Sequence, residues 1–201
     1  LSNVGAAAIK TDGTLWMWGN NNHGQLGLGN TTNYSSPKQV GALTNWSSIN
    51  CGYGWSMALK TDGTLWTWGW NSFGELGDGT IGDGSSPKQV GSLTNWLSVA
   101  CGYYHAIAVK TDGTLWTWGK NVTYGQLGLG DVVNKSSPTQ VGALTNWLKV
   151  TAGGYHCLAI KTDGTLWTWG GNTYGELGQN STIKKSSPVQ VGALTDWSYI
   201  G

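Results

Sequence analysis

The sequence of 201 residues is rich in glycine and tryptophan, with 33 Gly and 14 Trp, and only 10% of its residues are charged. Its 39% hydrophobic content excludes a disordered chain, and no apolar run approaches the roughly 18 residues that a membrane span requires. The formal net charge is +1 and arginine is absent, which argues against nucleic acid as a partner, because phosphate and guanine recognition rely on guanidinium groups. We therefore expect a globular chain with no nucleic-acid partner and no membrane insertion.

A repeat of about fifty residues organises the whole sequence, which is the signature of a repeat architecture. The segment Lys-Thr-Asp-Gly-Thr-Leu-Trp begins at Lys10, Lys60, Lys110 and Lys161. Ser-Ser-Pro and Leu-Thr-Asn/Asp-Trp recur in step with it. The repeats cover about residues 1–50, 51–100, 101–151 and 152–201, and we expect them to form one domain or propeller segment over residues 1–201.

The first predicted strand runs from Ala6 to Lys10 and is followed by Asp12-Gly13, a dipeptide that recurs in every repeat. Asp-Gly between alternating apolar runs predicts a two-residue type I′ hairpin. In the third repeat such a turn places Lys110 opposite Leu115 and Val109 opposite Trp116. This register predicts a bulky face and a slender face, made respectively by Ile107, Val109, Trp116 and Trp118, and by Ala106, Ala108, Leu115 and Thr117.

Two further strands complete each repeat. Pro87 to Val90 is typical of an edge strand, because proline gives up an N–H and lysine discourages edge pairing. Trp96 to Cys101 is the remaining strand, and it leads into a Gly-rich loop. Four short antiparallel strands per repeat are typical of a propeller blade, and we expect the bulky face of one blade to pack on the slender face of the next.

The first and last strands of the sequence are complementary parts of one blade. Ala6 to Lys10 has the pattern of a second strand, and Trp197 to Ile200 has the pattern of a first strand. We expect the C-terminal strand or a neighbouring chain to complete the first blade. A closed ring of four blades, a ring of eight blades shared by two chains, and a longer array all remain open.

Each repeat follows a common order of motifs. Gly-x-x-His, present at Gly102–His105 and Gly153–His156, precedes an apolar strand, Asp-Gly-x-Leu-Trp-x-Trp-Gly, Asn-x-x-Gly-Gln/Glu-Leu-Gly and Pro-x-x-Val. This pattern resembles the repeats of the RCC1 (regulator of chromosome condensation) family over all four copies, although residues 1–5 lack the Gly-x-x-His element. The resemblance implies an all-β RCC1-type β-propeller, a fold that in this family usually has about seven blades. The short repeats are similar to those of bacterial and phage members, and none carries the long insertion with which eukaryotic nucleotide-exchange members contact their GTPase.

The cysteines, the histidines and the acidic segment of this sequence are better explained by structural roles than by catalysis or metal binding. The three cysteines form no C-x-x-C pair, and His105 and His156 have no neighbouring third ligand. Residues 78–84 are acidic and Gly-rich but lack EF-hand spacing. We predict no catalytic residue, no metal site, no cofactor and no enzymatic activity.

The aromatic residues that break the repeat are the predicted partner-binding residues, because Tyr and Trp are favoured interface anchors. They are Tyr53, Trp55, Trp70, Tyr103, Tyr104, His105 and Tyr155. His23 shares its place in the repeat with Phe73, Tyr124 and Tyr174, which favours a packing role.

We interpret the chain as an interaction or structural module for a protein or glycan, part of a homo-oligomer or larger assembly. Its expected location is extracellular or on a virion surface, with the cytoplasm as the alternative. Two alternative functions are a regulator of a GTPase or chromatin-like partner, by family analogy, and a secreted enzyme inhibitor that binds through aromatic loop residues.

Overall fold

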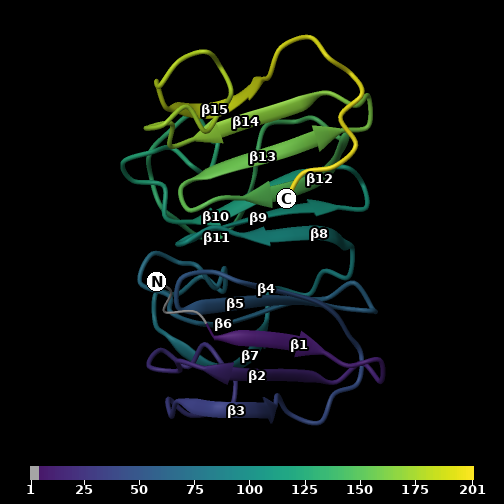
Figure 1. Ribbon diagram of the computed structural model, residues 1–201, viewed down its shortest axis with the longest axis vertical. Helices are drawn as coiled ribbons and strands as arrows, with labels where there is room; N and C mark the ends of the chain where they lie inside the picture. The colour runs from purple at the N-terminus through teal and green to yellow at the C-terminus, as the bar shows by residue number, and fades with distance from the viewer. Residues whose placement is uncertain (1–4) are drawn as a thin grey trace.

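The computed structural model describes residues 5–201, and within that range the chain forms fifteen β-strands and no helix (Figure 1). The absence of a Gly-x-x-His element was noted above for residues 1–5, and residues 1–4 of this segment lie outside the described residues. The first sheet has three strands, β1 (Ala6–Ile9), β2 (Leu15–Gly19) and β3 (Tyr34–Gln39). The second contains β4 (Trp46–Cys51), β5 (Trp55–Lys60), β6 (Leu65–Gly69) and β7 (Gly84–Gln89).

The third and fourth sheets repeat this four-stranded pattern. The third contains β8 (Trp96–Cys101), β9 (His105–Lys110), β10 (Leu115–Gly119) and β11 (Lys135–Gln140). The fourth contains β12 (Trp147–Ala152), β13 (His156–Lys161), β14 (Leu166–Gly170) and β15 (Lys185–Gln190). We call the four sheets blades 1 to 4 in chain order. Since none of the described residues forms a helix, none offers a helical membrane span.

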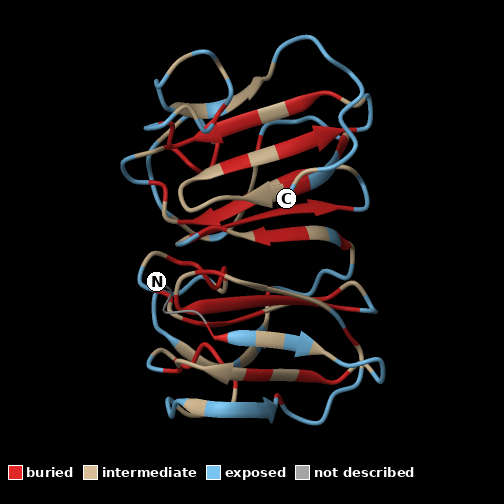
Figure 2. Ribbon diagram, viewed as in Figure 1, coloured by how far each residue is buried: buried red, intermediate tan, exposed pale blue. Residues whose placement is uncertain are grey.

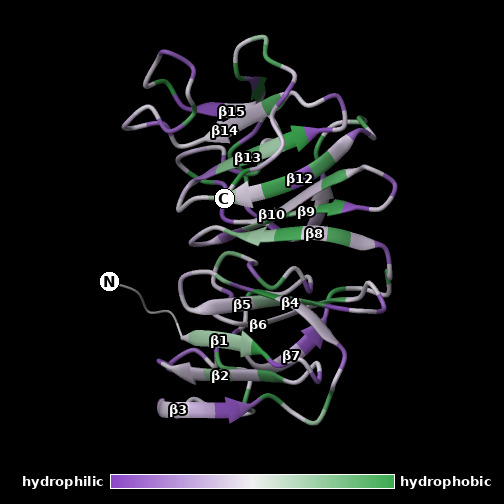
Figure 3. Cartoon of the chain, turned by 45° about the vertical axis from the view of Figure 1, so that its right-hand side comes forward, coloured by the Kyte–Doolittle hydropathy of each residue, from purple (hydrophilic) through white to green (hydrophobic). Residues whose placement is uncertain are grey.

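The blades follow one another along the long axis of the molecule (Figure 1). Within each blade, consecutive strands pair antiparallel, as expected for a propeller. Strand β8 contacts both β4 and β12, so the first strands of successive blades lie next to one another. Strand β7 is strongly hydrophilic in Figure 3 and lies at the edge of its sheet, in agreement with the edge position predicted for Pro87 to Val90.

The predicted hairpin register is wrong by one residue. In the structure Val109 lies opposite Leu115 and Ala108 lies opposite Trp116. The glycine of the Asp-Gly dipeptide has a positive φ in every repeat, and at Gly113 it is 76°. Asp112, in contrast, does not have a positive φ. The loop therefore has three residues, with Gly113 in the left-handed region, rather than the two positive-φ residues of a type I′ turn.

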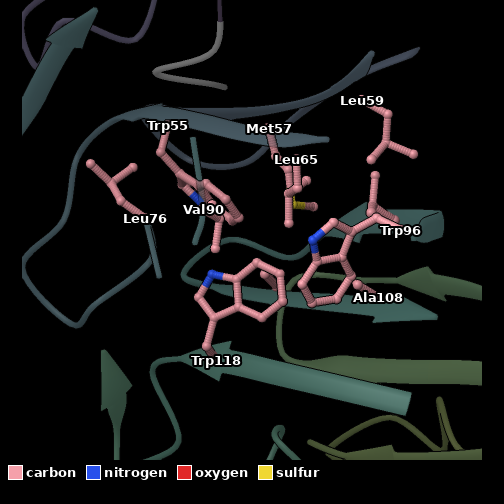
Figure 4. Close-up of a cluster of buried hydrophobic side chains, with 11 residues drawn as sticks. Trp55, Met57, Leu59, Leu65, Leu76, Val90, Trp96, Ala108 and Trp118 are labelled. Carbon is pink, nitrogen blue, oxygen red and sulfur yellow. The ribbon is translucent and has the colours of Figure 1, made fainter. Parts of the chain in front are cut away.

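The composition of the two blade faces changes with the register, because a shift of one residue moves a side chain to the opposite face. One face of blade 3 is aliphatic and the other combines small alanines with large tryptophans. Ala108 and Trp118 pack against Met57 and Leu65 of blade 2 (Figure 4). Successive blades still nest, but the complementary surfaces are an aliphatic face and an Ala–Trp face.

A buried indole ties each blade to the one before it. Trp68, Trp118 and Trp169 are fully buried. Their Nε1 atoms donate to the backbone oxygens of the residues that precede Leu in the Gly-Gln/Glu-Leu-Gly loops, at 2.8, 2.8 and 3.0 Å: Gln25, Glu75 and Gln126. These bonds fix the loops that emerge between blades.

Among residues 5–201, blade 1 contains three strands and no counterpart of the first strand of the other blades. Residues 197–200 form no strand and do not pair with β1. Completion of blade 1 by the C-terminal strand of the same chain, one of the two expected arrangements, is therefore not observed in the part of the chain that the structure describes.

Candidate functional site

The loops that join the first and second strands of blades 2, 3 and 4 lie side by side. The backbone N–H of Tyr53 donates to the oxygen of Tyr103 at 3.0 Å, and the N–H of Tyr103 donates to the oxygen of Gly154 at 3.1 Å. Each loop is thus hydrogen-bonded to its neighbour in the next blade. This arrangement holds the aromatic side chains of the three loops at one end of the blades.

Five of the seven predicted residues form a continuous group of rings. Tyr53 lies 6.3 Å from Trp70 and 5.5 Å from Tyr104 between ring centroids. Tyr155 lies 5.4 Å from Tyr103 and 6.5 Å from Tyr104. We call these five residues the aromatic surface. Tyr103 is its most accessible member, with 49% of its surface exposed.

The other two predicted residues, Trp55 and His105, are in the interior. Trp55 is 1% exposed and donates its indole Nε1 to the oxygen of Tyr103 at 2.9 Å. His105 is fully buried, with its Nε2 atom 3.2 Å from the Sγ of Cys157. The prediction that Trp55 and His105 contact a partner directly is therefore wrong, because both rings are buried beneath the loops that carry the aromatic surface.

The Gly-x-x pattern before each buried ring is a signal that the sequence analysis missed. A Cβ on Gly52 would lie 2.0 Å from Nε1 of Trp55, and a Cβ on Gly102 would lie 2.0 Å from Cε1 of His105. The glycine is needed because the ring packs directly on its Cα. In the loops between the first and second strands, a glycine three residues before a ring thus marks a ring that packs inward.

Three more rings extend the aromatic surface. His23 stacks on Trp70 at 4.2 Å, Phe73 lies 5.7 Å from Tyr104, and Tyr124 lies 4.9 Å from Tyr155 between centroids. These residues share one position in the repeat. The predicted packing role of His23 agrees with its stacking on Trp70, which also connects this position of the repeat with the predicted binding residues.

One cation and one buried carboxyl group accompany the rings. The Lys120 Nζ lies 4.6 Å from the ring centroid of Phe73 and 5.0 Å from that of Tyr104. Glu75 is fully buried and its Oε2 accepts a hydrogen bond from the backbone N–H of Phe73 at 2.8 Å. Burial, with a smaller contribution from the charge of Asp83, raises the pKa of Glu75 to about 7, although hydrogen bonds from backbone N–H groups and the charge of Lys120 oppose this change.

A hollow of about 410 Å³ adjoins the aromatic surface on the side of blade 4. It is lined by Tyr103, Tyr124, Tyr155 and Tyr174, with the carboxylate of Glu176 as a polar group. Burial and the neighbouring tyrosines raise the pKa of Tyr155, so its phenol stays protonated and can donate a hydrogen bond at neutral pH. Rings with phenol groups can therefore bury apolar surface and hydrogen-bond a ligand.

The structure also describes the surroundings of the three cysteines. Cys51, Cys101 and Cys157 are free thiols, and burial raises the pKa of each, which keeps them as unreactive thiols. Among residues 5–201 there is no group of three or more His, Cys, Asp and Glu side chains that could hold a metal ion.

Comparison with protein families gives one match that spans the chain. A family model described as "RCC1-like domain" matches residues 5–200. Two curated proteins match short segments: the X-linked retinitis pigmentosa GTPase regulator of Canis lupus familiaris is 54% identical over 35 residues, and that of Homo sapiens is 46% identical over 43 residues. These segments cover 17% and 20% of this chain and 4% of each relative.

Solved structures show the same fold at low sequence identity. Human WBSCR16 is 24% identical with a TM-score of 0.84, and the match covers 96% of this chain and 52% of that one. Prp20p from Saccharomyces cerevisiae, described with its binding to Gsp1p and histones, is 23% identical with a TM-score of 0.81, covering 93% and 48%. The chain thus spans about half the length of these solved structures.

Proposed function

The chain belongs to the RCC1-like family, and from that premise we propose that it is a non-enzymatic interaction module whose aromatic surface binds a protein partner. The carrying observation is the continuous contact between Tyr53, Trp70, Tyr103, Tyr104 and Tyr155 on loops from three blades. Tyrosine and tryptophan are enriched among the residues that dominate binding energy. Hydrogen bonds between neighbouring loops hold these rings in place before binding, which reduces the entropy lost when a partner is bound.

A protein partner is favoured over a glycan by the similar structures. Prp20p is described with Gsp1p and histones, and a second structure of yeast RCC1 (Prp20) is described as bound to Kap60. All of these partners are proteins. The 11 lysines of this chain are accompanied by 10 acidic residues and no arginine, which supports apolar and hydrogen-bonded recognition over the reading of a highly charged partner.

The test uses a displayed peptide library, selected against the immobilised protein, with a glycan array screened in parallel. We expect selected peptides whose affinity falls at least about tenfold, or about 1.4 kcal/mol, in Tyr103→Ala and in Trp70→Ala. Leu144→Ala is the matched control, because Leu144 is 48% exposed and lies in the β11–β12 loop, at the opposite end of the blades. Ligands found only on the glycan array, or peptides insensitive to both aromatic variants, would reject the proposal.

Regulation of a GTPase is the second candidate function. It is supported by the names of the curated relatives, which are GTPase regulators, and by the description of Prp20p with Gsp1p. A nucleotide-exchange assay with fluorescent GDP bound to a Gsp1p-type GTPase distinguishes it from simple binding. Faster GDP release that is lost in Tyr103→Ala would favour the regulator, whereas an unchanged release rate would leave the binding module as the only proposal.

We also propose that the module acts outside the cell or on a virion. The near-neutral charge supports a place in a larger assembly such as a virion, because a net charge close to zero promotes association. Immunoblots of cell, medium and virion fractions from the native source test it. Protein found only in the cell fraction would contradict this location.

A further inference from the structure

Three pockets lie away from the aromatic surface, one at each junction between successive blades. Each has a volume of about 340 to 350 Å³, which is within the range of small-molecule sites. Each takes one wall from the loops of the earlier blade and the other wall from the strands of the later blade. We call them the junction pockets. They share no lining residue with the aromatic surface.

The same positions of the repeat line all three junction pockets. The earlier blade supplies a valine, a glycine and a leucine, and the later blade supplies two tryptophans and a proline. The leucines lie in the loops that join the blades and are 44 to 48% exposed: Leu43, Leu93 and Leu144. Figure 2 shows that β9 and β10 are largely buried, whereas the loops at the ends of the strands are largely exposed. A pocket that recurs in this way is a product of the repeat and not a packing fault at one junction.

The half-buried tryptophan of each junction pocket offers its ring and not its N–H group. The Nε1 atoms of Trp66, Trp116 and Trp167 donate to a threonine of the same blade at 2.8, 2.8 and 2.9 Å. Together with the valine, leucine and proline, these rings make the lining mainly apolar. Such a lining suits a ligand with an aromatic body better than a sugar, whose many hydroxyl groups need hydrogen-bond partners when they are buried.

A buried lysine stacks on the two tryptophans of each junction pocket. Lys110 lines the pocket between blades 2 and 3, and its Nζ lies 3.6 Å from the ring centroid of Trp116 and 4.8 Å from that of Trp96. Lys60 and Lys161 repeat this stack on the tryptophans of the other two pockets. Each stack belongs to the later blade alone. The three lysines are only 5 to 7% exposed.

These three buried ammonium groups have no anionic partner. Among residues 5–201 none of them forms an ion pair or donates a hydrogen bond, whereas Lys88 pairs with Asp78 at 2.8 Å. Burial lowers the pKa of each of the three, and the charge of an exposed aspartate two residues along the chain opposes this change. The tryptophan faces offset part of the cost of burying the charge. A bound anion would supply the partner that the ammonium groups lack.

We propose that the junction pockets bind small aromatic carboxylates. The ring of the ligand packs against the tryptophan, leucine and proline side chains, and its carboxylate lies at the lysine ammonium group. The volume is close to the lower end of the range of small-molecule sites, which suits a compact ligand. Because the junction pockets and the aromatic surface are separate, the chain can hold such a ligand and a protein partner together.

The first test compares two ligands that differ only in charge. The 201-residue protein is dialysed to equilibrium against naphthoate and, separately, against the neutral naphthamide. We expect saturation at three naphthoate molecules per chain, with naphthamide bound at least about fivefold more weakly because it lacks the charge-assisted contact with lysine. Absence of saturable binding, or equal affinity for the acid and the amide, would overturn the proposal.

The second test removes the three cations. In the variant with Lys60→Met, Lys110→Met and Lys161→Met, the unbranched side chains still fill the space beside the tryptophans. We expect the preference for naphthoate over naphthamide to disappear, while naphthamide still binds. Lys184→Met is the matched control, because Lys184 is exposed and lines none of the junction pockets. A preference that persists in the triple variant, or that is lost equally in the control, would contradict the role of the buried lysines.

The third test locates the ligand on the natural protein, so that the proposal stays falsifiable if the triple variant unfolds. In NMR titrations with naphthoate, the methyl signals of Leu43, Leu93 and Leu144 should shift, because the ring of the bound ligand lies beside them. Shifts confined to Tyr103 and Tyr155 would place the ligand on the aromatic surface and reject the junction pockets.

Discussion

The buried carboxyl of Glu75 gives a sharp test of the electrostatics beneath the aromatic surface. We consider Glu75→Gln, which keeps the shape of the side chain and removes its charge. Glutamine occupies the same position in two other repeats, as Gln25 and Gln126, and both are buried there. The fold therefore accepts an amide at this place.

The magnitude follows from the pKa. Burial raises it from 4.5 to about 7, and each tenfold change in proton affinity corresponds to about 1.36 kcal/mol. The folded state therefore holds its proton more tightly than the unfolded state. The unfolding free energy of the natural protein should fall as the pH rises from 4.5 to 7, by at most about 3 kcal/mol, and then level off. The Glu75→Gln variant has no carboxyl group to titrate, so its free energy of unfolding should not fall in this way. It should exceed that of the natural protein by up to this amount at pH 8 and by little at pH 4.

The assay is urea unfolding followed by tryptophan fluorescence across this pH range, with the difference between variant and natural protein plotted against pH. Glu176→Gln is the control, because Glu176 is exposed and backbone N–H groups lower its pKa. It should give no gain at pH 8. If Glu75→Gln stabilises the protein equally at pH 4 and pH 8, the carboxyl is not desolvated and the reasoning fails.

Three further predictions concern the packing of blades and loops. Gly77→Ala and Gly91→Ala both place a side chain at positive φ, but only the Cβ at Gly77 would meet another group, the indole of Trp118 at 2.7 Å. Gly77→Ala should therefore lower the free energy of unfolding, measured in urea, by about 1 kcal/mol or more beyond the effect of Gly91→Ala. Equal losses would contradict the close contact between blades. Burial lowers the pKa of His105 to about 3, so its imidazole should stay neutral in NMR titrations above pH 5. Its contribution to the free energy of unfolding should fall as the pH drops from 6.5 towards 3, because the unfolded state then binds the proton more readily. Titration of His105 near pH 6.5 would refute this prediction. Thr117→Val should cost about 1 to 3 kcal/mol in urea unfolding, because it removes the bond of 2.7 Å from Oγ1 to the buried oxygen of Leu127; an unchanged midpoint would contradict that bond.

The repeat and its four-strand pattern could be predicted from sequence because the packing residues are copied. Trp96–Cys101 was predicted to the residue, since its apolar run and flanking loops recur. The hairpin register was not, because Asp-Gly is compatible with more than one loop. A three-residue loop with only Gly113 at positive φ replaces the two-residue turn, and the sequence alone does not decide between them.

The one-residue error did not affect the predicted architecture, for a physical reason. Either register gives each blade two different apolar faces, and successive copies of one blade must then bring unlike faces together. Nesting depends on that difference and on close packing, and the particular partner of Trp116 does not enter. The register decides instead which side chains meet, and here it pairs Trp116 with Ala108.

The candidate site was less predictable, because variation among copies has two sources. The positions of Tyr103 and His105 both vary among repeats, with Gly154 in place of the tyrosine and Trp55 in place of the histidine, yet Tyr103 is 49% exposed and His105 is fully buried. A surface position varies when its contacts lie outside the blade, whereas the buried position varies because Trp55 and His105 fill similar space over Gly52 and Gly102. Only the packing of a ring on the preceding glycine distinguishes the buried position from the surface position. It follows that a search for binding residues in such repeats should first remove every ring that packs on the Cα of the glycine three residues before it, as Trp55 and His105 do.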